Sequence, residues 1–203
     1  IDVKNVTLEN PQTTADLLAS SGYVYVQKSQ FGGGSPQLRG YGTNRVMLVV
    51  DGVRMNNAIF RSGNLQNVIV IDPLSLSDVE VLYGPGSTMF GSDAIGGVME
   101  FDTKKALYAP DSTREFVQTN LFSRFNSASN EITGHADFSY GNSRFASATA
   151  VTYSMFGDLT TGVNGDSAFL RPSYQSGDQT LVNPNPRQQI HSGYDQFNAL
   201  QKF

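Results

Sequence analysis

Apolar and polar side chains alternate along the second half of the chain, in three segments between residues 115 and 156. Because successive side chains of a β-strand point to opposite faces, this period of two predicts strands with one apolar and one polar face. The apolar faces carry Val117, Thr119, Leu121 and Phe125, then Ile132, Gly134, Ala136, Phe138 and Tyr140, then Phe145, Thr149, Val151, Tyr153 and Met155. Segments of about 9–11 residues with this two-sided character are typical of strands that face lipid in a β-barrel.

The connections between these segments differ in length. Gly141-Asn142 predicts a tight turn, whereas residues 157–188 form a long polar connection rich in Gly, Pro and Asn. A soluble β-sandwich also alternates, but short turns at one end and long loops at the other favour an outer-membrane barrel. A further strand begins near His191 and still runs at Phe203. Because an open sheet of about four strands leaves its edge groups unsatisfied in lipid, we expect most of the barrel to lie outside this chain.

Residues 1–105 have shorter apolar runs, separated by turn residues. They predict a helix over residues 13–18 and strands over residues 23–26, 46–50, 79–82 and 98–101. Gly32–Pro36 predicts a flexible loop, and Asp51-Gly52 predicts a hairpin turn. This pattern indicates a mixed α+β unit with a small sheet and short helices. The composition changes near Lys104-Lys105, so we place the domain boundary between residues 105 and 106.

Composition excludes several classes of function. The chain is 39% hydrophobic and 16% charged, has a net charge of -4 and contains no cysteine. The absence of a Lys/Arg run argues against nucleic acid as a partner, and the absence of cysteine excludes disulfides and thiolate metal sites. No apolar run approaches the roughly 20 residues of a membrane helix. No signal peptide is visible and Ile1 is not a start residue, which indicates a mature or trimmed fragment.

No catalytic motif is found. The glycines between Gly84 and Gly97 do not have the spacing of a phosphate-binding loop, and no lysine follows them. The sequence contains neither GxSxG nor HExxH. We therefore interpret the glycines as tight turns in a compact sheet and do not expect an enzyme or a bound cofactor.

The segment Val79–Phe101 (VEVLYGPGSTMFGSDAIGGVMEF), with Asp51-Gly52-Val53 and Leu38-Arg39-Gly40 upstream, resembles the plug domain of TonB-dependent outer-membrane receptors. The resemblance implies a plug over residues 1–105 and the first strands, about four, of a transmembrane β-barrel over residues 106–203, with an extracellular loop near 157–188. It also implies that the barrel is incomplete in this chain. The amino-acid sequence of residues 51–103 is similar to that of haem receptors of Bacteroidetes-like bacteria.

For such a receptor the resemblance implies a place in the bacterial outer membrane, in contact with its lipid. The implied partners are TonB with its inner-membrane energising complex, the remaining barrel and the imported ligand. The favoured cargo is iron, as haem or as a ferric siderophore. An importer of oligosaccharide or peptide capped by a surface lipoprotein is an alternative. A non-transporting binding protein or adhesin is another.

The resemblance also nominates site residues. Two loops correspond to plug apices that face the outside, and amides, arginines and aromatics suit polar or ring-shaped ligands. Their candidate ligand contacts are Phe31, Arg54, Asn56, Asn57, Phe60, Arg61 and Asn64. For each residue an ordinary polar loop is the competing interpretation. Arg39 and Arg45 are candidates for ion pairs with the barrel wall. No metal site is predicted, and the weak haem-ligand candidates are Tyr41, Met55 and His135.

Overall fold

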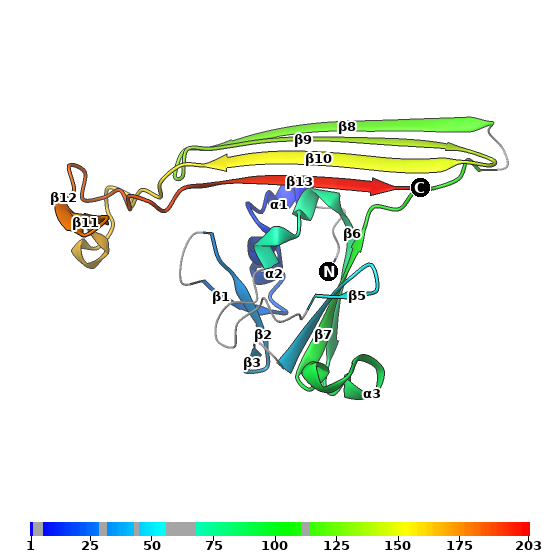
Figure 1. The fold of residues 1–203 in the computed structure, drawn as a ribbon, viewed down its shortest axis with the longest axis horizontal. Coiled ribbons are helices and arrows are strands. Elements are labelled where there is room, and N and C mark those ends of the chain that lie inside the picture. The colour runs from blue at the N-terminus through cyan, green and yellow to red at the C-terminus, as the bar shows by residue number, and fades with distance from the viewer. Residues whose placement is uncertain (2–5, 29–31, 43–44, 56–67, 111–113) are drawn as a thin grey trace.

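The computed structural model describes residues 1, 6–28, 32–42, 45–55, 68–110 and 114–203. It has two layers (Figure 1): a long antiparallel sheet lies across an N-terminal part that ends with β7 at Thr103. Among the described residues, no helix combines the length and the apolar composition needed to cross a membrane.

The long sheet has the strand order β13-β10-β9-β8. Its strands are β8 (Glu115–Asn126), β9 (Glu131–Asn142), β10 (Ala146–Phe156) and β13 (Tyr194–Lys202). Each neighbouring pair is antiparallel, as the alternating pattern predicted. One detail was wrong: Gly141 and Asn142 still pair within the sheet, opposite Ala146 and Glu115 respectively, so the turn follows them.

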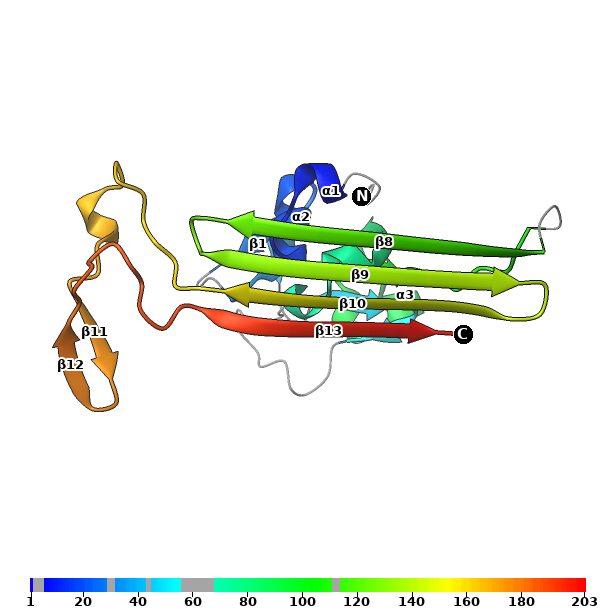
Figure 2. The same cartoon turned by 90° about the horizontal axis from the view of Figure 1, so that it is seen from above.

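The connection between β10 and β13 is long, as expected, and it contains structure of its own. A short 3-10 helix, η6 (Ser167–Phe169), precedes a hairpin made of β11 (Ser173–Ser176) and β12 (Gln179–Val182). Figure 2 shows this hairpin beyond one end of the long sheet. The short turn between β9 and β10 lies at the opposite end.

The N-terminal part combines two small sheets with short helices, which confirms the mixed α+β prediction. The first sheet contains β1 (Tyr25–Gln27), β2 (Ser35–Leu38) and β3 (Tyr41–Gly42). The second has the order β5-β4-β7-β6, from β4 (Val46–Val50), β5 (Val53–Arg54), β6 (Leu76–Tyr83) and β7 (Gly97–Thr103). The helices are α1 (Val6–Glu9), α2 (Thr14–Ser20), η3 (Val68–Val70), η4 (Pro73–Ser75), α3 (Ser87–Phe90) and η5 (Ser92–Ala94).

Local sequence explains several of these boundaries. Helix α2 begins with a capping box, because Thr13 and Asp16 each bind the backbone N–H of the other. Asp51 and Gly52 have φ angles of 47° and 79°, the left-handed pair that a two-residue hairpin requires. The predicted loop over residues 32–36 is wrong at its end: Ser35 and Pro36 belong to β2. Proline is tolerated there because β2 is short and its bordering strands have only a few residues.

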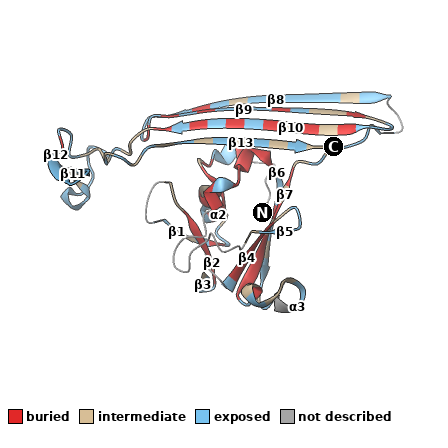
Figure 3. Cartoon of the chain, viewed as in Figure 1, coloured by how far each residue is buried: buried red, intermediate tan, exposed pale blue. Residues whose placement is uncertain are grey.

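The core lies between the second small sheet and the helices (Figure 3). Its fully buried side chains include Leu17, Leu18, Val46, Val79 and Phe101. A Cβ on Gly96 would lie 2.4 Å from the Cβ of Tyr41, so only glycine lets β3 approach the start of β7 this closely. The glycines near residue 96 therefore serve packing, as the sequence indicated.

Candidate functional site

The long sheet presents different chemistry on its two faces. Its outer face exposes Leu121, Phe125, Ile132, Phe138 and Tyr153. Its inner face is polar yet buried, because the N-terminal part covers it (Figure 3). The buried inner residues include Arg124, Glu131, Thr133, His135, Asp137, Thr152 and Ser154. Buried polar groups of this density need partners, so the interface between the two layers is the candidate site.

At one place on this face an ion pair contacts the N-terminal part. The guanidinium of Arg124 binds Oε1 of Glu131 through Nε at 2.7 Å and through Nη2 at 2.6 Å. The side chains are 4% and 0% exposed. Thr133 donates a further hydrogen bond to the same carboxylate oxygen at 2.7 Å. Both charges therefore belong to the long sheet and neutralise each other within it.

The remaining donors of Arg124 bind the segment between α1 and α2. Nη1 donates to the Pro11 carbonyl at 2.8 Å and to the side-chain oxygen of Asn10 at 3.3 Å, and Nη2 donates to the Gln12 carbonyl at 3.3 Å. The Gln12 amide donates back to Glu131 and to Ser129. The N-terminal part thus contributes only neutral groups here, and the planar fork of arginine suits several such acceptors.

A second cluster of hydrogen-bonded polar side chains lies between η4 and the long sheet. Thr152 donates to the carboxylate of Asp72, which also accepts from Ser75 and from the Leu74 N–H. Nδ1 of His135 lies 2.6 Å from the Thr152 hydroxyl, and its Nε2 lies 3.2 Å from Asp137. Both ring nitrogens of His135 therefore have partners in this arrangement.

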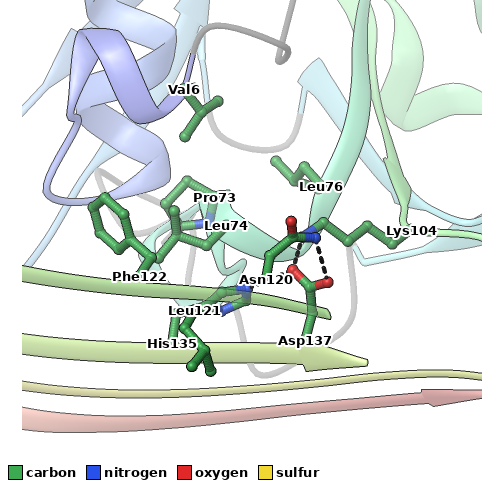
Figure 4. Close-up of a pocket in the computed structure, with 10 residues that line it drawn as sticks. All are labelled: Val6, Pro73, Leu74, Leu76, Lys104, Asn120, Leu121, Phe122, His135 and Asp137. Atoms are coloured by element: carbon green, nitrogen blue, oxygen red, sulfur yellow. Dashed lines mark hydrogen bonds and ion pairs between the residues drawn. The ribbon is translucent and has the colours of Figure 1, made fainter. Parts of the chain in front are cut away.

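A cavity of about 280 Å³ opens beside this group (Figure 4). Lys104 and Asn120 both bind Asp137 at its edge, at 2.6 and 2.8 Å. Pro73, Leu74 and Phe122 form an apolar part of its lining. Among the described residues no group of three His, Cys, Asp or Glu is placed to hold a metal ion.

A third attachment lies where β7 ends. Asp51 accepts from the N–H and the hydroxyl of Thr103, at 2.9 and 2.7 Å, and its carboxylate lies 3.0 Å from the Lys202 ammonium of β13. Burial raises the pKa of Asp51, but the hydrogen bonds from Thr103 and the charge of Lys202 outweigh it, so the pKa lies below 3.8. This attachment joins the two layers through opposite charges.

The predicted site residues are spread over the molecule. Arg39 lies exposed with its guanidinium 4.9 Å from the centre of the Tyr83 ring, and among the described ion pairs neither it nor Arg45 takes part. The ion pairing of Arg39 and Arg45 with the wall stays a prediction, because most of a barrel is absent here. Tyr41 is 42% exposed and Met55 packs at the edge of the core.

Of the ligand-contact candidates, Arg54 is exposed on β5. Six others lie outside the described residues: Phe31, Asn56, Asn57, Phe60, Arg61 and Asn64. The alternation of the long strands puts Arg124, Glu131 and Asp137 on the face opposite the predicted apolar side chains, but none of them was a candidate site residue. Charged residues at alternate positions of a strand that faces a plug were the signal that could have identified them.

Comparisons with known proteins identify the family of the N-terminal part. The family model described as "TonB-dependent Receptor Plug Domain" matches residues 1–98. Residues 1–98 belong to the plug-domain family of TonB-dependent receptors. The N-terminal part is therefore called the plug from here on. This match indicates a protein of the bacterial outer membrane. In the structure the plug lies against the inner face of the long sheet.

Relatives and solved structures extend the match beyond the plug. The chain is 30% identical over 140 residues to a hemin receptor of Yersinia pestis, which covers 68% of this chain and 19% of that protein. It is 40% identical over 82 residues to a vitamin B12 transporter of Vibrio vulnificus, covering 38% and 13% of the two chains. The FrpB iron transporter from Neisseria meningitidis shares the fold over 93% of this chain and 26% of its own, with a TM-score of 0.67 and 18% identity.

The coverages compare the length of this chain with the lengths of the proteins that it matches. The chain spans about a fifth of the length of the hemin receptor that it matches. The fold is that of a plug followed by antiparallel barrel strands, as the resemblance implied, and the four strands form an open sheet.

Proposed function

We propose that this chain is the plug and the opening strands of an importer that carries iron across the outer membrane, as haem or as a ferric siderophore. The observation that carries the proposal is the interface itself. A folded plug is attached by hydrogen bonds to the polar face of a sheet whose other face is apolar. Such an interface keeps the plug in place, and water can take over its hydrogen-bonding groups when the plug moves.

TonB, with its inner-membrane energising complex, is the proposed source of the force that opens the plug. External ligand would favour the conformation in which TonB engages, because a ligand shifts an equilibrium by its differential affinity for the two states. Transport requires no catalytic step in this chain, and the relatives are named as receptors and transporters.

The cargo proposal is supported by the relative named as a hemin receptor. The proposed ligand contacts remain the apical residues Phe31, Arg54, Asn56, Asn57, Phe60, Arg61 and Asn64. Arg54 is exposed on β5, where it is open to a ligand. Tyr41 remains the more accessible haem-ligand candidate, since Met55 and His135 are packed or hydrogen-bonded.

The test is a haemin titration of the complete, detergent-solubilised receptor, followed by visible absorption, together with growth of the producing cells on haem as the iron source. A saturable shift to an axially ligated spectrum and TonB-dependent growth are the expected results. Binding without growth would instead favour a non-transporting binding protein or adhesin. If neither the spectral shift nor the growth is observed and a surface lipoprotein copurifies with the receptor, an importer of oligosaccharide or peptide is favoured instead.

A further inference from the structure

The plug is attached to the long sheet at two ends that differ in chemistry. Near the end of β7, Lys104 pairs with Asp137 and Lys202 pairs with Asp51. These ion pairs cross between the layers, close to where β7 of the plug ends at Thr103. At the other end, the Asn10–Gln12 segment is attached through hydrogen bonds to Arg124.

This difference in chemistry determines which charged groups lose their partners when the plug separates from the long sheet at each end. When the Lys104–Asp137 pair is broken, the side chain of Asp137, which is 4% exposed, keeps an unpaired charge, and this is costly where water does not reach it. The side chains of Lys202 and Asp51 are 25% and 30% exposed, so water reaches that pair and breaking it costs less. When the Asn10–Gln12 segment leaves, Arg124 and Glu131 remain paired with each other on the long sheet. The segment carries away only the side-chain amides of Asn10 and Gln12 and two backbone carbonyls, which water satisfies.

The segment is also shaped for this contact. Asn10 adopts a φ of 51° and its N–H binds the Val6 carbonyl, which ends α1 and directs Pro11 and Gln12 toward the sheet. The Arg124 guanidinium lies 5.9 Å from the ring centre of Phe122 and is fixed by Glu131. Both partners are therefore held in position before they meet.

We propose that Arg124, positioned by Glu131, is a latch on the Asn10–Gln12 segment, and that the latch opens before the attachments near Lys104 during transport. This inference rests on the proposed import function, in which TonB supplies the force that opens the plug. Arg124 acts here as a positioning residue. It holds the plug closed and does not contact the cargo.

The turn between β8 and β9 supplies a reporter for the latch. Ser129 is 1% exposed and accepts a hydrogen bond from Gln12, whereas Ser127 in the same turn is exposed. The chain contains no cysteine, so Ser129→Cys introduces a single thiol in this part of the receptor. Ser127→Cys is the matched control, because its thiol is open in both states.

The experiment measures modification of each thiol by a membrane-impermeant maleimide, in cells that produce the complete receptor. With haemin and an energised membrane, modification at position 129 should accelerate at least tenfold, while position 127 should not change. Haemin import with undiminished protection at position 129 would overturn the latch. Absence of haemin import by the wild-type receptor would instead contradict the proposed cargo, so the two failures are distinguishable.

A second arm weakens the latch at rest, without ligand. Arg124→Lys keeps the charge beside Glu131 but loses the fork of donors, so resting modification at position 129 should rise several-fold with ligand binding unchanged. Arg144→Lys in the exposed turn before β10 is the control. Gln12→Met tests the same contact from the plug side. Gln37→Met is its control because, in the described part of the chain, the Gln37 amide donates to Gln27 within the plug. Unchanged protection in correctly assembled variants would contradict the proposal.

Discussion

The plug has two buried surfaces with opposite chemistry. Its own core is apolar, with Leu17, Leu18 and Phe101 fully buried. Its contact with the long sheet is made largely of hydrogen bonds and ion pairs around Arg124, Asp72 and Asp51. Apolar burial stabilises in proportion to the area removed from water and has no substitute in water, whereas a hydrogen bond is replaced by one to water. A plug built this way keeps its own fold while it separates from the sheet.

The largest effect is expected in the core. Phe101→Ala removes a side chain that is 0% exposed and should lower the free energy of unfolding of the plug by about 3–5 kcal/mol. The measurement is urea unfolding of residues 1–105 produced alone, after circular dichroism shows that this fragment is folded. Val53→Ala on the exposed strand β5 is the control and should change little. A wild-type fragment with a random-coil spectrum would refute an independent plug core.

The outer face of the long sheet is a third surface to compare, because it is apolar and is expected to face lipid. Phe138 is 45% exposed on that face. Phe138→Arg should impair assembly in the membrane by about 2–4 kcal/mol if the residue lies at mid-bilayer depth. The heat-modifiable folded fraction measures this, with Gln118→Arg on the polar face of β8 as the control. Equal assembly of both variants would place Phe138 away from lipid.

At the interface the expected effect is smaller. Thr152→Val keeps the side-chain shape but removes the hydroxyl that donates to the Asp72 carboxylate and contacts His135, which should weaken the attachment by about 1.5–3 kcal/mol. Faster amide hydrogen exchange in η4, with unchanged exchange in α2, is the expected observation. Thr149→Val on the same strand removes an exposed hydrogen bond to Gln201 and is the control. Equal acceleration in α2 would show that the core and the interface are not separate.

The smallest effect concerns Asp51. Because its pKa in the folded protein lies below 3.8, its stabilising contribution is present above that pH and is lost as the pH falls through the lowered pKa. Asp51→Asn, which tolerates the left-handed turn, should speed exchange of the Thr103 amide at neutral pH. The difference from wild type should shrink as the pH falls below 3.8. A constant difference across that range would exclude the carboxylate charge as its cause.

The long strands could be predicted because their period of two is a local pattern. The hairpin at Asp51-Gly52 could be predicted because its turn type requires those residues. The parallel pairing of β4 with β7 could not, since Val46 and Gly97 are distant in the sequence. The same limit applies to the site. The alternation placed Arg124 on a polar face, but its partner Pro11 lies 113 residues away and contributes a backbone carbonyl, which carries no side-chain signal. Family resemblance supplied the plug and not these contacts.

The pairing of Arg124 with Glu131 has a consequence for biogenesis. The two residues lie on adjacent strands joined by a short turn, so their charges neutralise each other as soon as the β8–β9 hairpin forms. Arg124 and Glu131 therefore pair without any group of the plug, whereas the buried carboxylate of Asp137 on β9 pairs with Lys104, which follows β7 of the plug. The hairpin thus carries one ion pair that is complete without the plug and one carboxylate whose cationic partner arrives with it.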